Sequence, residues 1–141
     1  MSNTQQYQRI DRDKVPLEIK YHRRSQTLEL IYSQHNSMQL SSEFLRVHSP
    51  SAEVQGHSPK QAVLQYGKKH VNIIDIVLQG SYAIKLCFDD KHDTGVFTWN
   101  YLWELAENQN TYWQHYLQAL EAAGRSRDIM VKQTPDNTTV E

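Results

Sequence analysis

The apolar residues follow two different periods along this chain, and the change between them is what most constrains the fold. Between residues 17 and 40, and again between residues 84 and 88, apolar side chains alternate with polar ones, a period typical of half-buried β-strands. After residue 101, apolar residues recur at spacings of three and four, which is typical of amphipathic helices. Strands followed by helices predict an α+β fold.

About six antiparallel strands are expected, in a meander or sheet. The first of them form a meander over residues 17–21, 28–32 and 38–40, with a turn at 34–37. The run from Val71 to Leu78 follows, and its β-branched residues predict a central strand covered on both faces. Residues 84–88 and 96–99 then form two strands around a hairpin loop from Asp89 to Gly95.

Helical segments are expected at three places. Ser41 and Ser42 cap a short helical turn near residues 42–48, and Pro50 lies beyond its end. Ser58-Pro59 begins a second short helix that ends at Gly67. Two C-terminal helices carry the apolar stripes around Leu102 and Leu120 and pack on the sheet, the last one ending at Gly124.

A chain of 141 residues is the usual size of one domain. Residues 1–14 are polar and have no period, so they are expected to form a flexible N-terminal segment. The domain then covers residues 15–127, and residues 128–141 form a flexible C-terminal tail.

The charge and the single cysteine exclude several classes of protein. Fifteen basic and sixteen acidic residues give a net charge of −1, which argues against a nucleic-acid partner. Cys87 has no second cysteine to pair with, which suits a reducing compartment. No segment resembles a signal peptide or approaches the roughly 20 apolar residues of a membrane span. We expect a cytoplasmic, monomeric protein without a membrane partner.

No catalytic motif is present in the sequence. Cys87 lies within a predicted strand, where a cysteine usually acts as a small apolar residue. No G-x-S-x-G motif occurs. Gly67-Lys68 lacks both the first glycine of a phosphate-binding loop, since position 62 is Ala, and the Ser or Thr after the lysine. We therefore expect no catalytic residues and no enzyme activity.

The predicted hairpin loop concentrates metal-ligand chemistry. Asp89, Asp90 and Asp93 surround His92, and carboxylates with an imidazole suit iron or another divalent ion. Acidic residues in a hairpin loop also bind their own backbone amides. Both interpretations remain open from the residues alone.

Four segments resemble the gamma-butyrobetaine hydroxylase-like N-terminal domain. They are residues 45–57, 80–83, 88–95 and 99–102, and the resemblance extends over roughly residues 15–127. The block Ser49-Pro50-Ser51-Ala52-Glu53-Val54 is its most specific part. The resemblance implies an α+β fold built on antiparallel strands. One departure is Lys91, where the family often has glycine, so a positive φ there would strain the lysine.

In the dioxygenases of this family, the resembling domain binds structural zinc through three cysteines and a histidine. Carried onto this chain, those positions are Ser49, Ser51, Val54 and His92, so only the histidine remains. A serine hydroxyl is a poor zinc ligand and valine is none. We therefore expect no structural zinc and no cofactor, with hydrogen bonds from Ser49 and Ser51 holding the loop instead.

The resemblance also suggests a role. Similar domains stand alone in bacteria, precede carnitine-pathway dioxygenases, or are joined to iron–sulfur carrier ATPases. We expect a non-catalytic binding or adaptor domain linked to iron or iron–sulfur protein metabolism, with such an ATPase or an oxygenase as protein partner. The candidate binding surface comprises Arg46, Ser49, Ser51, Glu53, Gly56, His57, Asp89, Asp90 and His92.

Two alternatives remain. One is a small metal-binding protein that holds iron or another divalent ion through His57, Asp90 and His92. The other is an accessory domain that acts with a carnitine-pathway-type dioxygenase.

Overall fold

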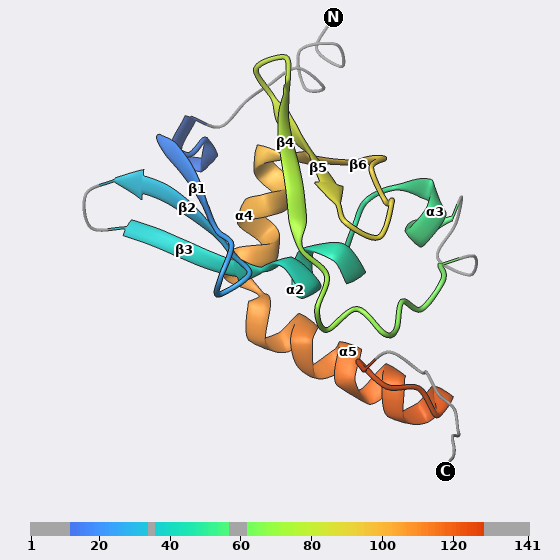
Figure 1. Ribbon diagram of the computed structural model, residues 1–141. Coiled ribbons are helices and arrows are strands. Elements are labelled where there is room, and N and C mark those ends of the chain that lie inside the picture. Colours follow the sequence, from blue (N-terminus) through green and yellow to red (C-terminus); the bar gives the residue numbers. More distant parts are fainter. Residues whose placement is uncertain (1–11, 34–35, 57–61, 129–141) are drawn as a thin grey trace, which may run out of the picture.

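The computed structural model describes residues 12–33, 36–56 and 62–128, and these form an α+β fold (Figure 1). The strands number six and are antiparallel, as predicted, and the structure divides them into two three-stranded sheets. The first sheet has the order β1 (Glu18–His22), β2 (Thr27–Ser33) and β3 (Asn36–Ser41). The second has the order β4 (Ile73–Gln79), β5 (Ala83–Phe88) and β6 (Gly95–Thr98).

Short helices connect the two sheets. A 3-10 helix, η1 (Arg12–Lys14), precedes the first strand. Helix α2 (Ser42–Val47) follows β3 directly and confirms the predicted helical turn, with Ser41 Oγ accepting a hydrogen bond from the Phe44 amide at 3.0 Å. Every residue of α2 is buried, so this single turn is part of the core. Helix α3 (Ala52–Gln55) lies a few residues further on.

Two C-terminal helices complete the domain, as predicted. Helix α4 (Trp99–Glu107) begins directly after β6, and α5 (Gln109–Ala123) follows it. Gly124 ends α5 in the left-handed conformation, φ 66°, and the next amide bonds back to the Leu120 carbonyl at 2.9 Å. This is the glycine stop that the sequence predicts.

The main core lies where both sheets face α2 and α4. In Figure 1, α4 runs between the two sheets, while α5 continues below them. Buried side chains of this core come from β2, β3, α2, β4, β5, β6 and α4. The largest that are fully buried are Leu28, Leu30, Leu40, Phe44, Leu45, Ile73, Ile84, Leu86, Phe88, Phe97, Leu102 and Leu105.

Three predictions about elements were wrong. Strand β4 is an edge strand in which only Ile73 is buried, so it is not central and not covered on both faces. Trp99 begins α4 instead of ending a strand. The helix predicted between residues 58 and 67 is not found in residues 62–67, its first residues lie outside the described ranges, and α3 was not expected.

The chain beyond α5 returns to the domain. The Gly67 amide donates to the Ser126 carbonyl at 2.9 Å, and the Lys69 amide donates to the Arg127 carbonyl at 3.0 Å. Residues 1–11 and 129–141, expected to be flexible, lie outside the described part of the chain. Within that part, no helix is long and apolar enough to cross a membrane.

Candidate functional site

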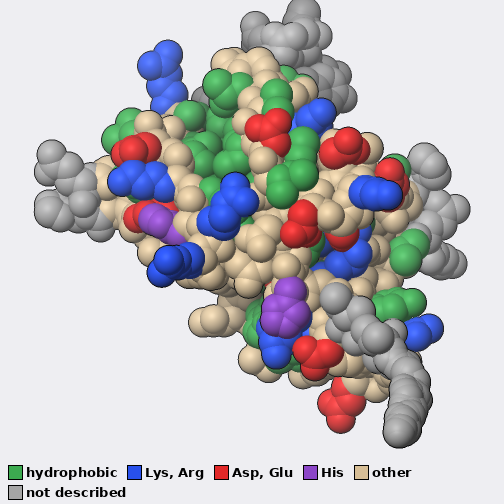
Figure 2. Space-filling model, viewed as in Figure 1, with side chains coloured by type: hydrophobic (Ala, Val, Ile, Leu, Met, Phe, Trp, Pro, Cys, Tyr) green, Lys and Arg blue, Asp and Glu red, His purple; other side chains and the backbone are tan. Residues whose placement is uncertain are grey.

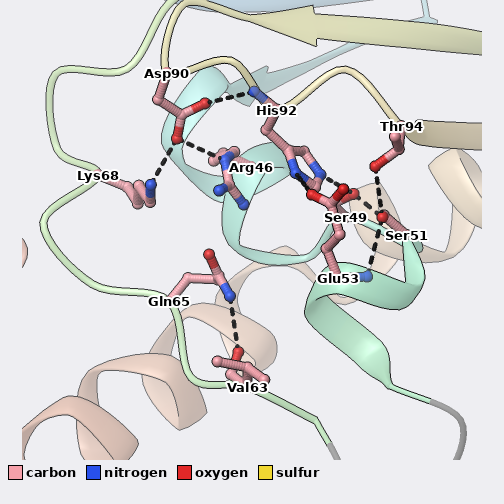
Figure 3. Close-up of polar contacts among 10 residues, drawn as sticks. All are labelled: Arg46, Ser49, Ser51, Glu53, Val63, Gln65, Lys68, Asp90, His92 and Thr94. Atoms are coloured by element: carbon pink, nitrogen blue, oxygen red, sulfur yellow. Dashed lines mark hydrogen bonds and ion pairs between the residues drawn. The ribbon is translucent and has the colours of Figure 1, made fainter.

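Two parts of the chain that are distant in sequence meet at one corner of the molecule (Figure 3). One is the end of α2 with the following segment 48–56, which contains α3, and the other is the hairpin loop 89–94 between β5 and β6. We call their meeting point the polar corner and define it by Arg46, Ser49, Ser51, Glu53, Asp90 and His92. All six were predicted from the sequence as part of one surface, and the structure brings them together.

His92 lies at the centre of the polar corner and is only 3% exposed. Its Nδ1 lies 3.0 Å from Glu53 Oε1, and its Nε2 lies 2.8 Å from Ser49 Oγ. A carboxylate only accepts, so Nδ1–H donates to Glu53 and Nε2 accepts the Ser49 hydroxyl in the neutral ring. The Ser51 amide in turn donates to Ser49 Oγ at 3.2 Å.

The surroundings keep the ring of His92 neutral. Burial lowers the pKa of His92, and the nearby charge of Arg46 lowers it further. The carboxylates of Glu53 and Asp90 act in the opposite direction but are outweighed. The neutral histidine therefore joins two segments of the chain through its hydrogen bonds.

Ser51 joins the same network from the other side. Its Oγ lies 2.7 Å from Thr94 Oγ1 and accepts the amide hydrogen of Glu53 at 3.1 Å, which caps α3. The side chain of Gln55 donates to the Ser49 carbonyl at 3.0 Å. The predicted hydrogen-bond network of Ser49 and Ser51 is thus confirmed.

Gly95 allows the hairpin to approach the serine loop this closely. A Cβ at position 95 would lie 2.5 Å from Ser49 Oγ and 3.2 Å from the ring of Phe97. Any side chain there would push Ser49 away from His92. Glycine is required here for space.

A partly buried ion-pair cluster closes the other edge of the polar corner. Asp90 Oδ2 accepts hydrogen bonds from Arg46 Nε at 2.9 Å and Lys68 Nζ at 2.6 Å. Burial raises the pKa of Asp90, but the hydrogen bond from Lys68 and the charge of Arg46 outweigh it and hold the pKa below its usual range. Its second oxygen accepts the His92 amide at 3.3 Å, so one carboxylate links helix, hairpin and the segment before β4.

Lys91 forms the tip of this hairpin with φ 72°. The backbone at this position therefore adopts the left-handed conformation, which glycine adopts without strain and a lysine does not. The glycine that the family often has here pointed to this conformation. The side chain of Lys91 is exposed.

The remaining predicted site residues lie around the corner. Asp89 is exposed and accepts the Asn72 amide at 3.1 Å. Gly56 ends α3 with φ 68°. Val54 is buried, and its carbonyl accepts the Val63 amide at 2.7 Å. His57 lies outside the described residues.

Sequence reasoning missed two members of the network. Thr94 was treated only as part of the hairpin loop, and Lys68 was considered for a phosphate-binding loop, which the sequence does not support. A signal for Thr94 exists, because it belongs to the resembling segment 88–95. Nothing in the sequence connects Lys68 with Asp90, 22 positions away.

The serine, histidine and glutamate follow the order of a hydrolytic triad. A triad needs its serine accessible to the substrate, but here Ser49 is fully buried while the Glu53 side chain is 63% exposed. Gly95 packs against the hydroxyl that would have to attack a substrate. In this conformation, the geometry supports a structural hydrogen-bond relay.

The donor set also fits poorly with a metal. Both nitrogens of His92 are engaged, and Asp90 is bound by two cations. Within the described ranges, no three His, Cys, Asp or Glu side chains converge on a point where an ion could sit. Of the family's zinc-ligand positions, Ser49, Ser51 and Val54 supply no thiolate, so zinc does not fit this corner.

Comparison with known proteins agrees with this architecture. The family model described as "Gamma-butyrobetaine hydroxylase-like, N-terminal" matches residues 19–103, more than half of the chain. No curated protein matches.

Solved structures share the fold over nearly their whole length. One NMR solution structure is 51% identical, covers 84% of this chain and 93% of its own, and has a TM-score of 0.72. Another is 44% identical, with 86% and 91% covered and a TM-score of 0.68. A crystal structure of a protein of unknown function from Acidithiobacillus ferrooxidans, a member of the DUF971 family, is 34% identical, with 69% and 98% covered and a TM-score of 0.56.

The match extends over the first sheet, the polar corner and the second sheet, and this chain belongs to the family of gamma-butyrobetaine hydroxylase-like N-terminal domains.

Proposed function

We propose that this chain is a non-catalytic binding domain that docks a protein partner on the rim of the polar corner. The observation that carries the proposal is the contrast between the inside and the outside of this corner. Inside, the side chains of Ser49, Ser51 and His92 bind one another or their neighbours. On the outside, the carboxylates of Glu53, Asp89 and Asp93 are exposed, and we call these residues, with Lys91, the rim of the polar corner.

A rigid corner with exposed charged loops suits recognition. The hydrogen-bond network fixes the backbone of two loops, so little conformational entropy is lost when a partner binds. Among the described residues of segments 48–56 and 89–94, three exposed carboxylates stand against one exposed cation, Lys91, and this gives the rim a negative charge. The complementary partner therefore presents a basic surface, which also accelerates encounter.

The partner class within this proposal is an iron–sulfur carrier ATPase or a carnitine-pathway-type dioxygenase, met in the cytoplasm. Membership of the family supports this assignment, because the resemblance implies that similar domains are joined to such proteins.

Affinity capture with matched variants tests the rim. Asp93→Lys reverses a charge that makes no side-chain ion pair or hydrogen bond with other described residues, and Glu121→Lys makes the same change on the exposed face of α5. We expect Asp93→Lys and Glu53→Lys to lose a captured protein that wild type and Glu121→Lys retain, at unchanged melting temperature for Asp93→Lys. Equal capture by all four proteins would refute the proposal.

The triad-like order of Ser49, His92 and Glu53 favours one competing function, ester or amide hydrolysis. If the buried hydroxyl is structural, Ser49→Ala will leave the hydrolysis of p-nitrophenyl acetate at the rate of wild type. A rate that falls with Ser49→Ala, while Cys87→Ala leaves it unchanged, would show that the chain is an enzyme.

The proposal includes no resident zinc or iron. Metal analysis of protein purified without an affinity tag is expected to give substoichiometric values for both. One metal per chain that is lost in His92→Gln would instead support the metal-binding alternative.

A further inference from the structure

A cavity of about 410 Å³ lies outside the polar corner and shares none of its residues. Its wall combines the β1–β2 turn, the start of α2, the segment before β4, the start of α5 and Arg127. On the face shown in Figure 2, a histidine and a basic side chain lie together over the start of α5 and the segment that leads into β4. The volume falls within the roughly 300–1,000 Å³ of small-ligand sites, so the cavity can hold a small molecule.

Hydrogen bonds hold the wall of this cavity in place. Gln26, in the β1–β2 turn, donates from its side-chain amide to the Val71 carbonyl at 3.0 Å. Its own carbonyl accepts the Ser42 amide at 2.9 Å and the Ser42 hydroxyl at 3.0 Å. The turn is therefore fixed both to α2 and to the segment before β4. Because the wall is already ordered, a ligand would lose little affinity to ordering it.

The charges in the wall leave it positive. Among the described residues that line the cavity, Glu43 is the one carboxylate, and its two oxygens accept hydrogen bonds of 2.8 Å from Arg127. A guanidinium has N–H donors beyond the two used here, and those of Arg127 make no hydrogen bond with the described residues. Lys69 Nζ lies 3.6 Å from Asp128 in an exposed pair, and such pairs are weak. Both cations can therefore bind a further anion.

The start of α5 also favours an anion. The side chain of Asn108 donates to the Glu104 carbonyl at 2.9 Å and makes no capping hydrogen bond to α5. The first backbone amides of a helix have no partner within it, and they carry the positive end of the helix dipole. Asn110, in the first turn of α5, lines the cavity. Two cations and an uncapped helix end therefore meet at one cavity.

We propose that this cavity binds a small organic anion, with its carboxylate or phosphate group between Lys69, Arg127 and the start of α5. Trp113 in the same wall supplies a flat apolar surface, and the Arg127 guanidinium lies 5.0 Å from its ring centre. A ligand that carries its charge on an aromatic ring can therefore contact the indole and the cations together. The site is independent of the function proposed for the polar corner.

NMR titration of the isotope-labelled full chain tests the site with three small aromatic probes. Benzoate and phenyl phosphate carry a negative charge on the ring, whereas benzamide is neutral. We expect at least one anion to shift the Trp113 indole signal and to saturate with a Kd below about 1 mM. Benzamide should bind at least about tenfold more weakly, because it makes no charge-assisted hydrogen bond. The tighter of the two anions identifies the preferred head group.

Two substitutions make the cavity less positive by different routes. Lys69→Gln removes a cation and should weaken binding of the tighter anion about two- to fivefold, as for an exposed charge pair. Asn110→Asp places a carboxylate at the cavity and should weaken binding by at least as much. The aspartate should not lower the melting temperature, because an acidic residue in the first turn stabilises a helix. Loss of structure therefore cannot explain the weaker binding of Asn110→Asp.

Matched changes outside the cavity serve as controls. Lys20→Gln breaks a similar exposed pair, with Glu18 at 3.8 Å, and Gln118→Glu adds a carboxylate further along α5. Both should bind the anion as wild type does. The proposal would be overturned if neither anion gave saturable shifts at about 10 mM, or if benzamide bound equally well. Unchanged affinity in Lys69→Gln or Asn110→Asp, or an equal loss in the controls, would overturn it too.

Discussion

His92 illustrates how a single residue can be fixed by its neighbours. Its ring is buried between Glu53, which accepts a hydrogen bond from Nδ1, and the Ser49 hydroxyl, which donates one to Nε2. Burial and the charge of Arg46 lower its pKa, so the neutral ring is the form that the folded protein favours. The family pattern has a zinc-ligating histidine at this position, and here the histidine acts as a structural hydrogen-bonding group.

Acid is therefore expected to destabilise the protein through two histidines whose pKa is lowered in the folded state. The pKa of His92 is lowered in the folded state, and burial also lowers that of His48. Below about pH 6.5, the unfolded chain then binds more protons than the folded one, so the free energy of unfolding falls as the pH falls. Thermal melts at about pH 7.5 and 5.5 should show a smaller loss for His92→Gln than for wild type. Equal losses would contradict the assignment.

Lys91 offers a second test at this scale. Its φ of 72° strains a residue with a Cβ. We expect Lys91→Gly to raise the free energy of unfolding by about 0.5–1 kcal/mol, the relief of strain being partly offset by the entropy of glycine. Lys91→Ala keeps the Cβ and should change little, as urea denaturation of the three proteins can show. Stabilisation by alanine as large as by glycine would point to the charge instead.

Most residues of the polar corner could be predicted from the sequence because they lie in specific sequence blocks. Ser49, Ser51 and Glu53 belong to a specific sequence block, and His92 to a second one, so a resemblance was enough to place them together. Lys68 reaches the same cluster from a segment without any motif. A tertiary ion pair to a residue outside any motif leaves no trace in one sequence.

Among the elements, periodicity predicted the strands and helices but not the position of each strand in its sheet. The run Ile73, Ile74, Ile76, Val77 and Leu78 has the composition of a buried central strand, yet it lies at an edge with most of its side chains exposed. Burial depends on what packs against a strand, which composition does not encode. The short helix α3 was missed because four residues are too few to show a period.

The contact between the β5–β6 hairpin and the serine loop can be tested at Gly95. Gly95→Ala places a methyl group 2.5 Å from Ser49 Oγ, so we expect the free energy of unfolding to fall by about 1–3 kcal/mol. Ser49→Ala removes that oxygen and leaves Cβ at 3.5 Å. The double variant should therefore lose less than the sum of the two single changes in urea denaturation. Additive losses would mean that the clash lies elsewhere.

At the scale of the whole molecule, the C-terminal end of the domain is tied to α2. Arg127, beyond the last helix, donates two hydrogen bonds of 2.8 Å to Glu43 in the first helix after the sheet. Its guanidinium also lies 5.0 Å from the ring centre of Trp113 on α5. The segment after α5 thus contacts both α2 and α5, and it closes the domain near the predicted boundary.

Breaking this tie should cost more than breaking a surface ion pair. The Glu43 side chain is only 6% exposed, so Arg127→Leu leaves a buried carboxylate without its cation. Because Arg127 itself is about a third exposed and water can partly replace it, we expect the free energy of unfolding to fall by about 1–3 kcal/mol.

Lys69→Leu breaks the exposed pair with Asp128 and should cost less than about 0.5 kcal/mol. Urea denaturation measures both, and Glu43→Gln in the Arg127→Leu background should recover part of the loss because the neutral amide is cheaper to bury. If Arg127→Leu costs no more than Lys69→Leu, the C-terminal segment is held by its backbone hydrogen bonds alone.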